Sequence, residues 1–492
     1  MEVIRFGYDG ILLNDTENSQ FRGAPPGYFS GLYNSLTNYH EDNILNIPKY
    51  FAEKLFNINF PITNIKEAVK DKPFSHLIFS IEIDEPTVGY FRKGAYNNSF
   101  PYIVEQSDYK TFLKEGKYFL FPYFPNNDYF FKGNSFIPSP PEDVLTAAQK
   151  GKCKIVFLYL NEGHVYREYQ FRKLYEFARK NNLSSNEIDF YHCNLKIKEA
   201  AKQYYRDIDE YINFIPISFF EIDLWFNKSL NRFSLKETLP PIHSVTKSLL
   251  EEYKLSIKPK RFLCLNRMAR GHRFNICSFL YSQKEINKNS LWSIGPFLGN
   301  TLEDRELAFT HQREASSRVL NRYSNIHTFF DDNKDKLLTT GIVLDEPEFS
   351  SKNLADQINI NLYKETYISI VTETEYHEDT IFFSEKVFKP MSVYHPFILL
   401  SSHGSLKKLK EFGYKTFDKW WDESYDQEPV YEKRLNLITK LIEELNNKPV
   451  EELHSMIMDM QTVLTHNYDL LYSSTNHIEL IKMLSCKNVN LI

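Results

Sequence analysis

The sequence predicts an α/β fold, in which strands and helices alternate along the chain and build two Rossmann-like domains. Residues 154–160 (KIVFLYL) are a continuous apolar run, typical of a parallel strand that is covered on both faces, and a helical segment follows at 167–180. In the second half, the β-prone runs 367–371 and 396–400 enclose a polar loop and a helical segment, which together make a βαβ unit. Such units imply a parallel sheet, and ligands of parallel sheets bind beyond the carboxyl ends of the strands.

The first half of the chain is predicted to hold an irregular lead-in, residues 1–70, followed by an α/β domain, residues 71–245. Its mixture of Gly, Pro, Asn and aromatic residues predicts irregular structure with short helices. The strands expected in the domain are 75–81, 118–124, 154–160, 188–193 and 214–220. The helices expected there are 142–150, 167–180 and 200–212.

The second half is predicted to hold another α/β domain, residues 246–425, and a helical C-terminal tail, residues 426–492. A Pro-Pro pair and a charged helix place the domain boundary within 227–260. The tail is helical because apolar residues recur at i, i+3, i+4 and i+7. The strands expected in the second domain are 261–265, 291–294, 341–344, 367–371 and 396–400.

Composition and charge narrow the class of protein. The chain has 492 residues, enough for two or three domains, and its 15% aromatic content argues against disorder. A net charge of -5 lacks the basic excess of a dedicated nucleic-acid binder, so nucleic acid is not the expected partner. Five cysteines without CxxC spacing, no secretory leader and no long apolar run predict a cytoplasmic protein with reduced thiols and no transmembrane segment.

Charged residues gather around the predicted βαβ unit of the second domain. Glu373, Glu375, Glu385 and Lys386 all fall at the carboxyl edge of the sheet. An anion can lie at the helix N-terminus near Ser384, where Lys386 adds a positive charge. A carboxylate nearby can accept both hydroxyls of a ribose. These parts suit a nucleoside diphosphate attached to a sugar.

This segment resembles the donor site of GT-B glycosyltransferases, especially the fucosyltransferase-like and related viral and bacterial enzymes. The family pattern is an acidic residue, a gap of about ten, Ser/Thr-Glu-Lys and then a strand that opens with Pro. Here Glu375, 384–386 and Pro396 match it. Residues 261–273 (RFLCLNRMARGHR) resemble the strand and loop that open the donor domain, where an Arg reaches the diphosphate. The first half of the chain carries no matching motif.

The resemblance implies two domains that face a cleft, with the acceptor on the side of 71–245 and the donor on the side of 246–425. It implies transfer of a hexosyl or deoxyhexosyl group from a nucleotide-diphosphate sugar, such as a GDP- or UDP-sugar, with no separate cofactor. The expected acceptor is a glycan, a glycolipid or a glycoprotein. The C-terminal helices are expected to cross back and brace the first domain.

Three arginines are candidates for the diphosphate. Arg267, Arg270 and Arg273 follow the strand 261–265, and the planar guanidinium suits bidentate contact with phosphate. The alternative is a solvated basic helix start. His272 is more consistent with a local structural role, and Asn266 with a cap of the following helix.

The acidic and lysine candidates lie around residue 385. Glu385 is the candidate for the ribose, with Lys386 beside it and Lys389 on roughly the same helix face. Glu373 and Glu375 compete for one role, and Glu375 has the spacing nearer to that of the family. The alternative for all of them is ordinary charge in the first turn of a helix, where Glu is favoured anyway. Pro390 leaves the start of that helix open.

The general base is expected from the first domain. Glu162, at the end of the strand 154–160, is the leading candidate, and His164, Glu82 and Asp84 are alternatives. Each can also be a residue that caps its loop. Asp207-Ile208-Asp209 is a literal DxD, but it lies inside a helical pattern. No metal site is therefore predicted, and basic residues are expected to stabilise the leaving diphosphate.

Two other functions remain open at this point. One is transfer of a sugar to a modified nucleic-acid base, which would need a basic channel in the first domain. The other is a non-catalytic nucleotide- or glycan-binding protein of the same fold. A dinucleotide enzyme is disfavoured because no GxGxxG follows a predicted strand.

Overall fold

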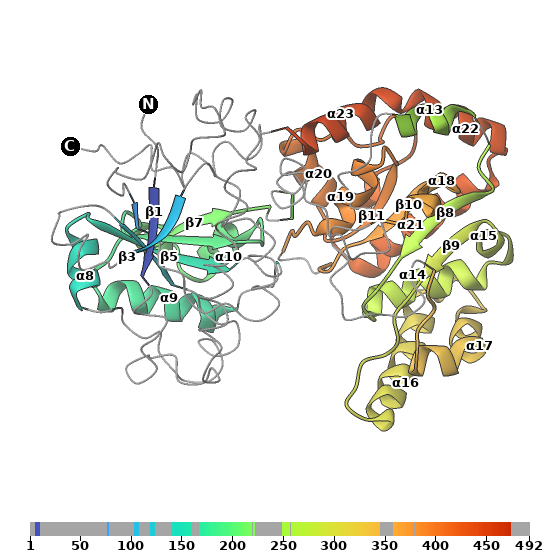
Figure 1. The fold of residues 1–492 in the computed structure, drawn as a ribbon. Coiled ribbons are helices and arrows are strands. Elements are labelled where there is room, and N and C mark those ends of the chain that lie inside the picture. The colour runs from blue at the N-terminus through green and yellow to red at the C-terminus, as the bar shows by residue number, and fades with distance from the viewer. Residues whose placement is uncertain are drawn as a thin grey trace. The chain divides into compact units, whose positions relative to one another are not determined.

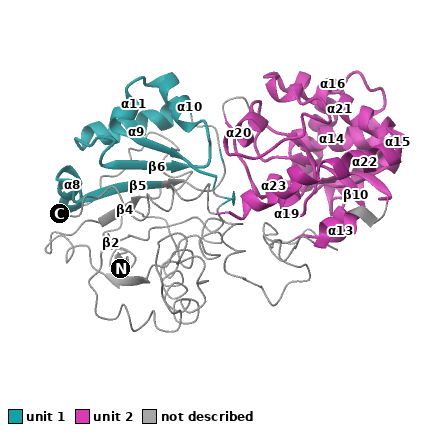
Figure 2. Cartoon of the chain, turned by 90° about the horizontal axis from the view of Figure 1, so that it is seen from above, with its two compact units in different colours: residues 1–232, 474–492 teal, residues 233–473 magenta. Residues whose placement is uncertain are grey.

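The chain divides into two compact units, residues 1–232 with 474–492 and residues 233–473 (Figures 1 and 2). Parallel sheets flanked by helices occur in both units, which confirms the predicted α/β class. The assignment of an acceptor side and a donor side stays a prediction. The computed structural model describes the strands 5–9, 76–77, 103–107 and 119–123 and residues 140, 142–159, 163, 167–218, 220–221, 248–255, 257–344, 358–376 and 380–473.

The described residues of unit 1 form two parallel sheets. The larger has the order β4-β5-β6-β7, formed by β4 (Phe119–Tyr123), β5 (Cys153–Tyr159), β6 (Ile188–His192) and β7 (Asn213–Pro216). The smaller has the order β2-β1-β3, formed by β1 (Arg5–Asp9), β2 (His76–Leu77) and β3 (Ile103–Ser107). The helices are α8 (Glu142–Gln149), α9 (Glu168–Lys180), α10 (Ile197–Tyr204) and α11 (Ile208–Tyr211).

An aromatic core holds α9 against the larger sheet of unit 1. Phe157 of β5 makes an edge contact with Phe177 of α9, and Phe190 of β6 contacts Phe214 of β7. The apolar run that predicted β5 is thus explained by burial. The single helix predicted at 200–212 is wrong, because α10 ends at Tyr204 and Asp207 takes the N-cap position of a separate α11.

Unit 2 is built on a four-stranded parallel sheet. Its order is β11-β10-β8-β9, formed by β8 (Lys260–Leu265), β9 (Ser290–Ser293), β10 (Thr366–Thr372) and β11 (Phe397–Leu400). The helices that follow these strands are α14 (Gly271–Ser282), α16 (Leu302–Val319), α19 (Glu385–Ser392) and α20 (Ser405–Glu411). The others are α13 (Ser248–Leu255), α15 (Lys284–Lys288), α17 (Ile326–Leu338), α18 (Ile360–Lys364) and the 3-10 helix η4 (Ser424–Gln427).

The helices of unit 2 cover its sheet from both sides. In Figure 1, α14, α16 and α17 gather on one side, and α13 lies on the other. The strand predicted at 341–344 is wrong, because Ile342 makes only an isolated antiparallel bridge with Ile294. Gly341 before it has a φ of 73°, a left-handed turn that interrupts extended backbone.

The C-terminal helices α21 (Tyr431–Asn447), α22 (Val450–Asp459) and α23 (Gln461–Leu471) belong to unit 2. The Arg261 guanidinium donates to the Leu445 carbonyl of α21 at 3.0 Å. Tyr468 of α23 stacks on Tyr394 with ring centroids 4.3 Å apart. A bracing contact with unit 1 stays a prediction. In the part of the chain that the structure describes, no helix combines the length and the apolar character needed to cross a membrane.

Candidate functional site

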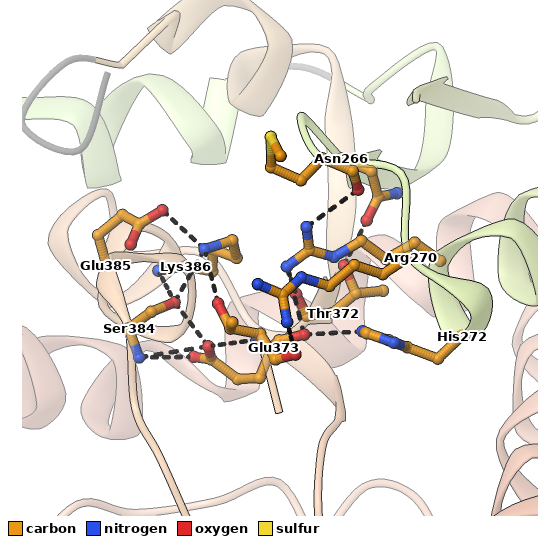
Figure 3. A network of polar contacts seen from close by, with 11 residues as sticks. Asn266, Arg270, His272, Thr372, Glu373, Ser384, Glu385 and Lys386 are labelled. Atoms are coloured by element: carbon orange, nitrogen blue, oxygen red, sulfur yellow. Dashed lines mark hydrogen bonds and ion pairs between the residues drawn. The ribbon is translucent and has the colours of Figure 1, made fainter. Parts of the chain in front are cut away.

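The candidate site lies at the carboxyl edge of the sheet in unit 2. Strands β8 and β10 are parallel neighbours, so the loops that follow them leave the sheet at the same edge. The loop after β8 leads into α14, and the loop after β10 leads into α19. Figure 3 shows the polar network that connects the two loops.

Asn266 ties the ends of the two strands together. Its side-chain oxygen accepts a hydrogen bond from the Thr372 hydroxyl, and its amide nitrogen lies 3.3 Å and 3.4 Å from the sulfurs of Cys264 and Cys277. The expected cap role of Asn266 is wrong, because Arg270 occupies the N-cap position of α14. Asn266 therefore fixes the spacing of the two loops.

The first turn of α14 is attached to the backbone after β10. The Arg273 guanidinium donates to the carbonyls of Thr372 at 3.4 Å and Glu373 at 3.3 Å, and to Met268 at 3.1 Å. His272 Nε2 lies 2.8 Å from the same Glu373 oxygen. Arg273 is 1% exposed and His272 is fully buried, so in this conformation neither side chain faces a ligand. The diphosphate contact predicted for Arg273 stays a prediction, and in this structure its guanidinium positions the loop.

Arg270 is placed differently from Arg273. Its guanidinium donates to the Thr374 carbonyl at 3.0 Å and lies 3.6 Å from the Glu375 carboxylate. The Arg270 side chain keeps 32% exposure, whereas Glu375 keeps 9%. Arg267 is also partly exposed. Arg270 is thus held by one carboxylate and one carbonyl while part of it stays accessible.

Glu373 is an internal carboxylate. Its oxygens accept hydrogen bonds from the Ser384 backbone at 3.1 Å, the Ser384 hydroxyl at 2.6 Å and the Thr374 backbone at 3.3 Å. Burial raises the pKa of Glu373, although Lys386 and the Ser384 hydrogen bonds oppose the shift. The carboxylate therefore closes the loop from 373 to 384 and is covered from solvent, so Glu375 is the more accessible of the two competing acids.

Helix α19 begins at Glu385, with Ser384 as its N-cap. The Ser384 hydroxyl accepts from the Lys386 backbone at 3.3 Å, as expected of a capping serine. Pro390 lies inside the helix and does not mark its start. The predicted start of this helix near Ser384 is confirmed.

Glu385 and Lys386 form an ion pair at the start of α19. Lys386 Nζ lies 2.9 Å from Glu385 Oε1, 3.1 Å from Ser384 Oγ and 3.4 Å from Thr374 Oγ1 (Figure 3). The Lys386 side chain is 22% exposed and the Glu385 side chain is 17% exposed. Burial alone would raise the pKa of the Glu385 carboxyl, but Lys386 and Lys389 outweigh it and hold this pKa at about 2. Glu385 is therefore a carboxylate throughout the neutral range.

The predicted basic and acidic residues thus divide into two groups. The structure places partly exposed side chains at one edge of the sheet: Arg267, Arg270, Glu385, Lys386 and Lys389. It buries Arg273 and Glu373 beneath them, with Glu375 nearly covered. Four basic groups against one exposed carboxylate leave this edge with a positive balance, which suits an anion.

Several predicted residues lie outside the site or outside the described residues. Glu162, His164, Glu82 and Asp84 belong to the segments that the structure does not describe. Asp207 accepts a hydrogen bond from Tyr175, and Asp209 pairs with Lys202, so the literal DxD is used by local contacts. Among the described residues, no group of three or more His, Cys, Asp or Glu is arranged to hold a metal ion.

Sequence reasoning missed residues that support the site from α21. Arg434 is buried and donates to the Tyr376 carbonyl at 3.0 Å and to the Glu428 carbonyl at 2.6 Å. The Tyr376 ring lies between the rings of His272 and Tyr431. A signal for Arg434 exists in the sequence. It precedes Ile438 by four residues, on the apolar stripe of α21, and a basic residue on such a stripe is usually tied to buried acceptors.

Comparisons with known proteins give only weak likenesses. No family model matches the chain, and no curated protein matches it. Among solved structures, an alpha1,3-fucosyltransferase is similar with a TM-score of 0.33 and 7% identity, covering 84% of this chain and 94% of the other. An alpha,alpha-trehalose 6-phosphate synthase from Burkholderia multivorans has a TM-score of 0.34 and 10% identity, with 80% of each chain covered.

A UDP-forming alpha,alpha-trehalose-phosphate synthase from Burkholderia vietnamiensis is similar at the same level. Its TM-score is 0.35 with 10% identity, and the match covers 93% of this chain and 86% of the other. Overlaps this loose do not carry the assignment of a function. The function has to be argued from the site itself.

Proposed function

We propose that this protein is a glycosyltransferase whose unit 2 binds a nucleotide-diphosphate sugar at the carboxyl edge of its sheet. The observation that carries the proposal lies between the ends of β8 and β10: partly exposed Lys386 pairs with the ionised Glu385, and partly exposed Arg270 pairs with Glu375. Cations suit a diphosphate, and a carboxylate suits the two hydroxyls of a ribose. This combination fits a nucleoside diphosphate better than a simple anion or a neutral sugar.

Each residue of the edge has a role in the proposal. Arg270 and Lys386 bind the diphosphate, with Arg267 and Lys389 adding positive charge. Glu385 accepts the ribose hydroxyls, and Glu375 orients the Arg270 guanidinium. The buried Arg273 and Glu373 hold the loops after β8 and β10 in place. Binding of the diphosphate thus depends on basic side chains that are held in place before the ligand arrives.

Sugar transfer requires the negative charge that develops on the leaving diphosphate to be stabilised. Fixed basic side chains can supply this stabilisation, so we propose that transfer does not depend on a divalent metal ion. The attacking hydroxyl needs a base, for which Glu162 is the candidate from the sequence and His164 the alternative. The proposed acceptor is a glycan, a glycolipid or a glycoprotein.

The proposal is tested with a panel of GDP- and UDP-sugars, incubated with the full-length protein in EDTA. We expect slow release of the nucleoside diphosphate from one of them, because glycosyltransferases transfer to water when no acceptor is present. Glu385→Ala should reduce this release at low donor concentration, while Glu452→Ala on the distant helix α22 should not. Release by neither class of donor, in a protein that is folded by circular dichroism, contradicts the enzymatic assignment.

A further inference from the structure

The ammonium group of Lys386 is already saturated with hydrogen-bond partners. An ammonium has three protons, and Lys386 Nζ has three oxygens within reach, from Glu385, Ser384 and Thr374. An incoming anion cannot gain a full hydrogen bond from Lys386 unless one of these partners leaves. Which partner leaves then decides what kind of ligand the site accepts.

Two of the three partners are fixed in place. The Ser384 hydroxyl donates to the buried Glu373 carboxylate at 2.6 Å and also caps α19, so its movement would open the loop. Thr374 is buried, which restricts its side chain, and its backbone is held at the carbonyl by Arg270 and at the nitrogen by Glu373. Moving the Ser384 hydroxyl or the Thr374 backbone would leave the buried Glu373 carboxylate short of a donor, which is costly.

Glu385 is the partner that can move. Its side chain is partly exposed and stands on the first turn of α19, and rotation about its side-chain bonds leaves the backbone unchanged. In Figure 3 the Glu385 carboxylate reaches across to the Lys386 nitrogen. The Glu385–Lys386 pair is therefore the contact that a ligand has to exchange.

We propose that Glu385 is a specificity-determining residue: its carboxylate competes with anions for Lys386 and is released only by a ligand that also offers hydroxyl donors. A diphosphate without a ribose displaces Glu385 and leaves its negative charge beside the new anion. A nucleoside diphosphate also brings two ribose hydroxyls, which take the place of Lys386 as hydrogen-bond partners of the Glu385 carboxylate. The site thereby rejects inorganic phosphate and pyrophosphate and favours a nucleoside diphosphate. The inference rests on the function proposed above.

The test is isothermal titration of pyrophosphate, UDP and GDP into the wild-type protein, Glu385→Gln and Glu452→Gln, all in EDTA. Glu452 pairs with Lys448 on α22, so its variant makes the same change of charge in an exposed ion pair away from the site. Removing a competing ion pair should tighten pyrophosphate binding to Glu385→Gln by about fivefold, the equivalent of about 1 kcal/mol. The same variant should bind the preferred nucleoside diphosphate more weakly than wild type, and Glu452→Gln should match wild type for every ligand.

Competition predicts that Glu385→Gln changes the two affinities in opposite directions, with tighter binding of pyrophosphate and weaker binding of the nucleoside diphosphate. If pyrophosphate binds Glu385→Gln with unchanged or weaker affinity while wild type binds UDP or GDP, the inference is overturned and the proposed function stands. If wild type binds neither UDP nor GDP, the proposed function fails, and the inference fails with it.

A second measurement needs no variant. In wild type, saturating uridine or guanosine should strengthen pyrophosphate binding, because the nucleoside supplies the hydroxyls that release Glu385 from Lys386. Binding linkage requires that pyrophosphate strengthens nucleoside binding by the same factor. Independent binding of the two halves would overturn the inference even if Glu385→Gln fails to fold.

Discussion

The two edges of the sheet in unit 2 treat basic side chains in opposite ways. At the amino edge, Lys258 is 5% exposed, and its ammonium donates to the carbonyls of Tyr363 at 2.8 Å and Thr366 at 2.7 Å. It also lies 3.6 Å from the centroid of the Tyr253 ring. At the carboxyl edge, Arg270 and Lys386 stay partly exposed and are paired with carboxylates.

The difference separates basic groups whose hydrogen bonds hold the fold together from basic groups that can bind a ligand. A covered cation whose donors end on backbone carbonyls cannot exchange its partners without breaking the fold. A partly exposed cation that is paired with a side chain can exchange this partner while the fold stays intact. Arg273 shows that the criterion is burial and not location, because it belongs to the carboxyl edge but donates to three backbone carbonyls.

Replacing the two neighbouring arginines should give the largest contrast. Arg273→Met should lower the free energy of unfolding by about 3 kcal/mol, because it leaves buried carbonyls without their donor. Arg270→Met should cost about 1 kcal/mol or less, since its ion pair is partly exposed, but it should weaken nucleotide binding. Urea unfolding measures the first effect and titration with UDP or GDP the second. Equal losses of stability would remove the distinction between the two arginines.

Lys258 should make stability depend on pH. Burial lowers the pKa of Lys258 from 10.5 to about 7, so between these values the unfolded chain binds a proton that the folded protein does not. Stability should therefore rise with pH across this window, and the cost of charging Lys258 is fully present below pH 7. Between pH 7 and pH 9, wild type should gain about 2 kcal/mol relative to Lys258→Met.

Urea unfolding of both proteins at the two pH values checks this prediction. The comparison with Lys258→Met cancels other groups that titrate in the same range. An identical pH dependence in the two proteins would mean that Lys258 does not carry the effect.

Glu385→Ala and Lys386→Gln should leave the fold nearly unchanged and act on the ligand. Hydrogen bonds to charged groups contribute about 1.5–3 kcal/mol, so each change should weaken nucleoside diphosphate binding by about tenfold or more. Glu411→Ala, on α20, removes an exposed partner of Lys408 and serves as the control. Normal affinity in a folded Lys386→Gln would remove Lys386 from the proposed site.

The sequence predicted the order of the elements well where one segment carries its own signal. The apolar runs of β5 and β10 and the helix-compatible segment that begins near Ser384 are local patterns, and the structure follows them. The break between α10 and α11 was missed because the apolar spacing continues across it. The segment 341–344 is apolar, which favoured a strand, but Gly341 adopts a left-handed turn and Ile342 forms only an isolated bridge with Ile294.

The roles within the site were harder to predict because they depend on contacts between distant segments. Arg270 and Arg273 have the same chemistry in the sequence. Only the packing of α14, whose residues from 272 to 280 are all buried, turns Arg273 inward. Glu373 differs from Glu375 because Ser384, eleven residues later, returns to cover it. No local sequence pattern predicts either contact, and the hydrogen bond from Arg434 to the Tyr376 carbonyl spans 58 residues.

The central claim is that the carboxyl edge of unit 2 binds a nucleoside diphosphate through fixed basic side chains. The most direct test is isothermal titration of UDP and GDP into the full-length protein, with EDTA and then with Mg²⁺. We predict that one of the two binds at a single site with the same affinity in both buffers, and that Lys386→Gln weakens this binding by about tenfold or more. Binding that appears only with Mg²⁺, or that is unchanged in Lys386→Gln, would contradict the account.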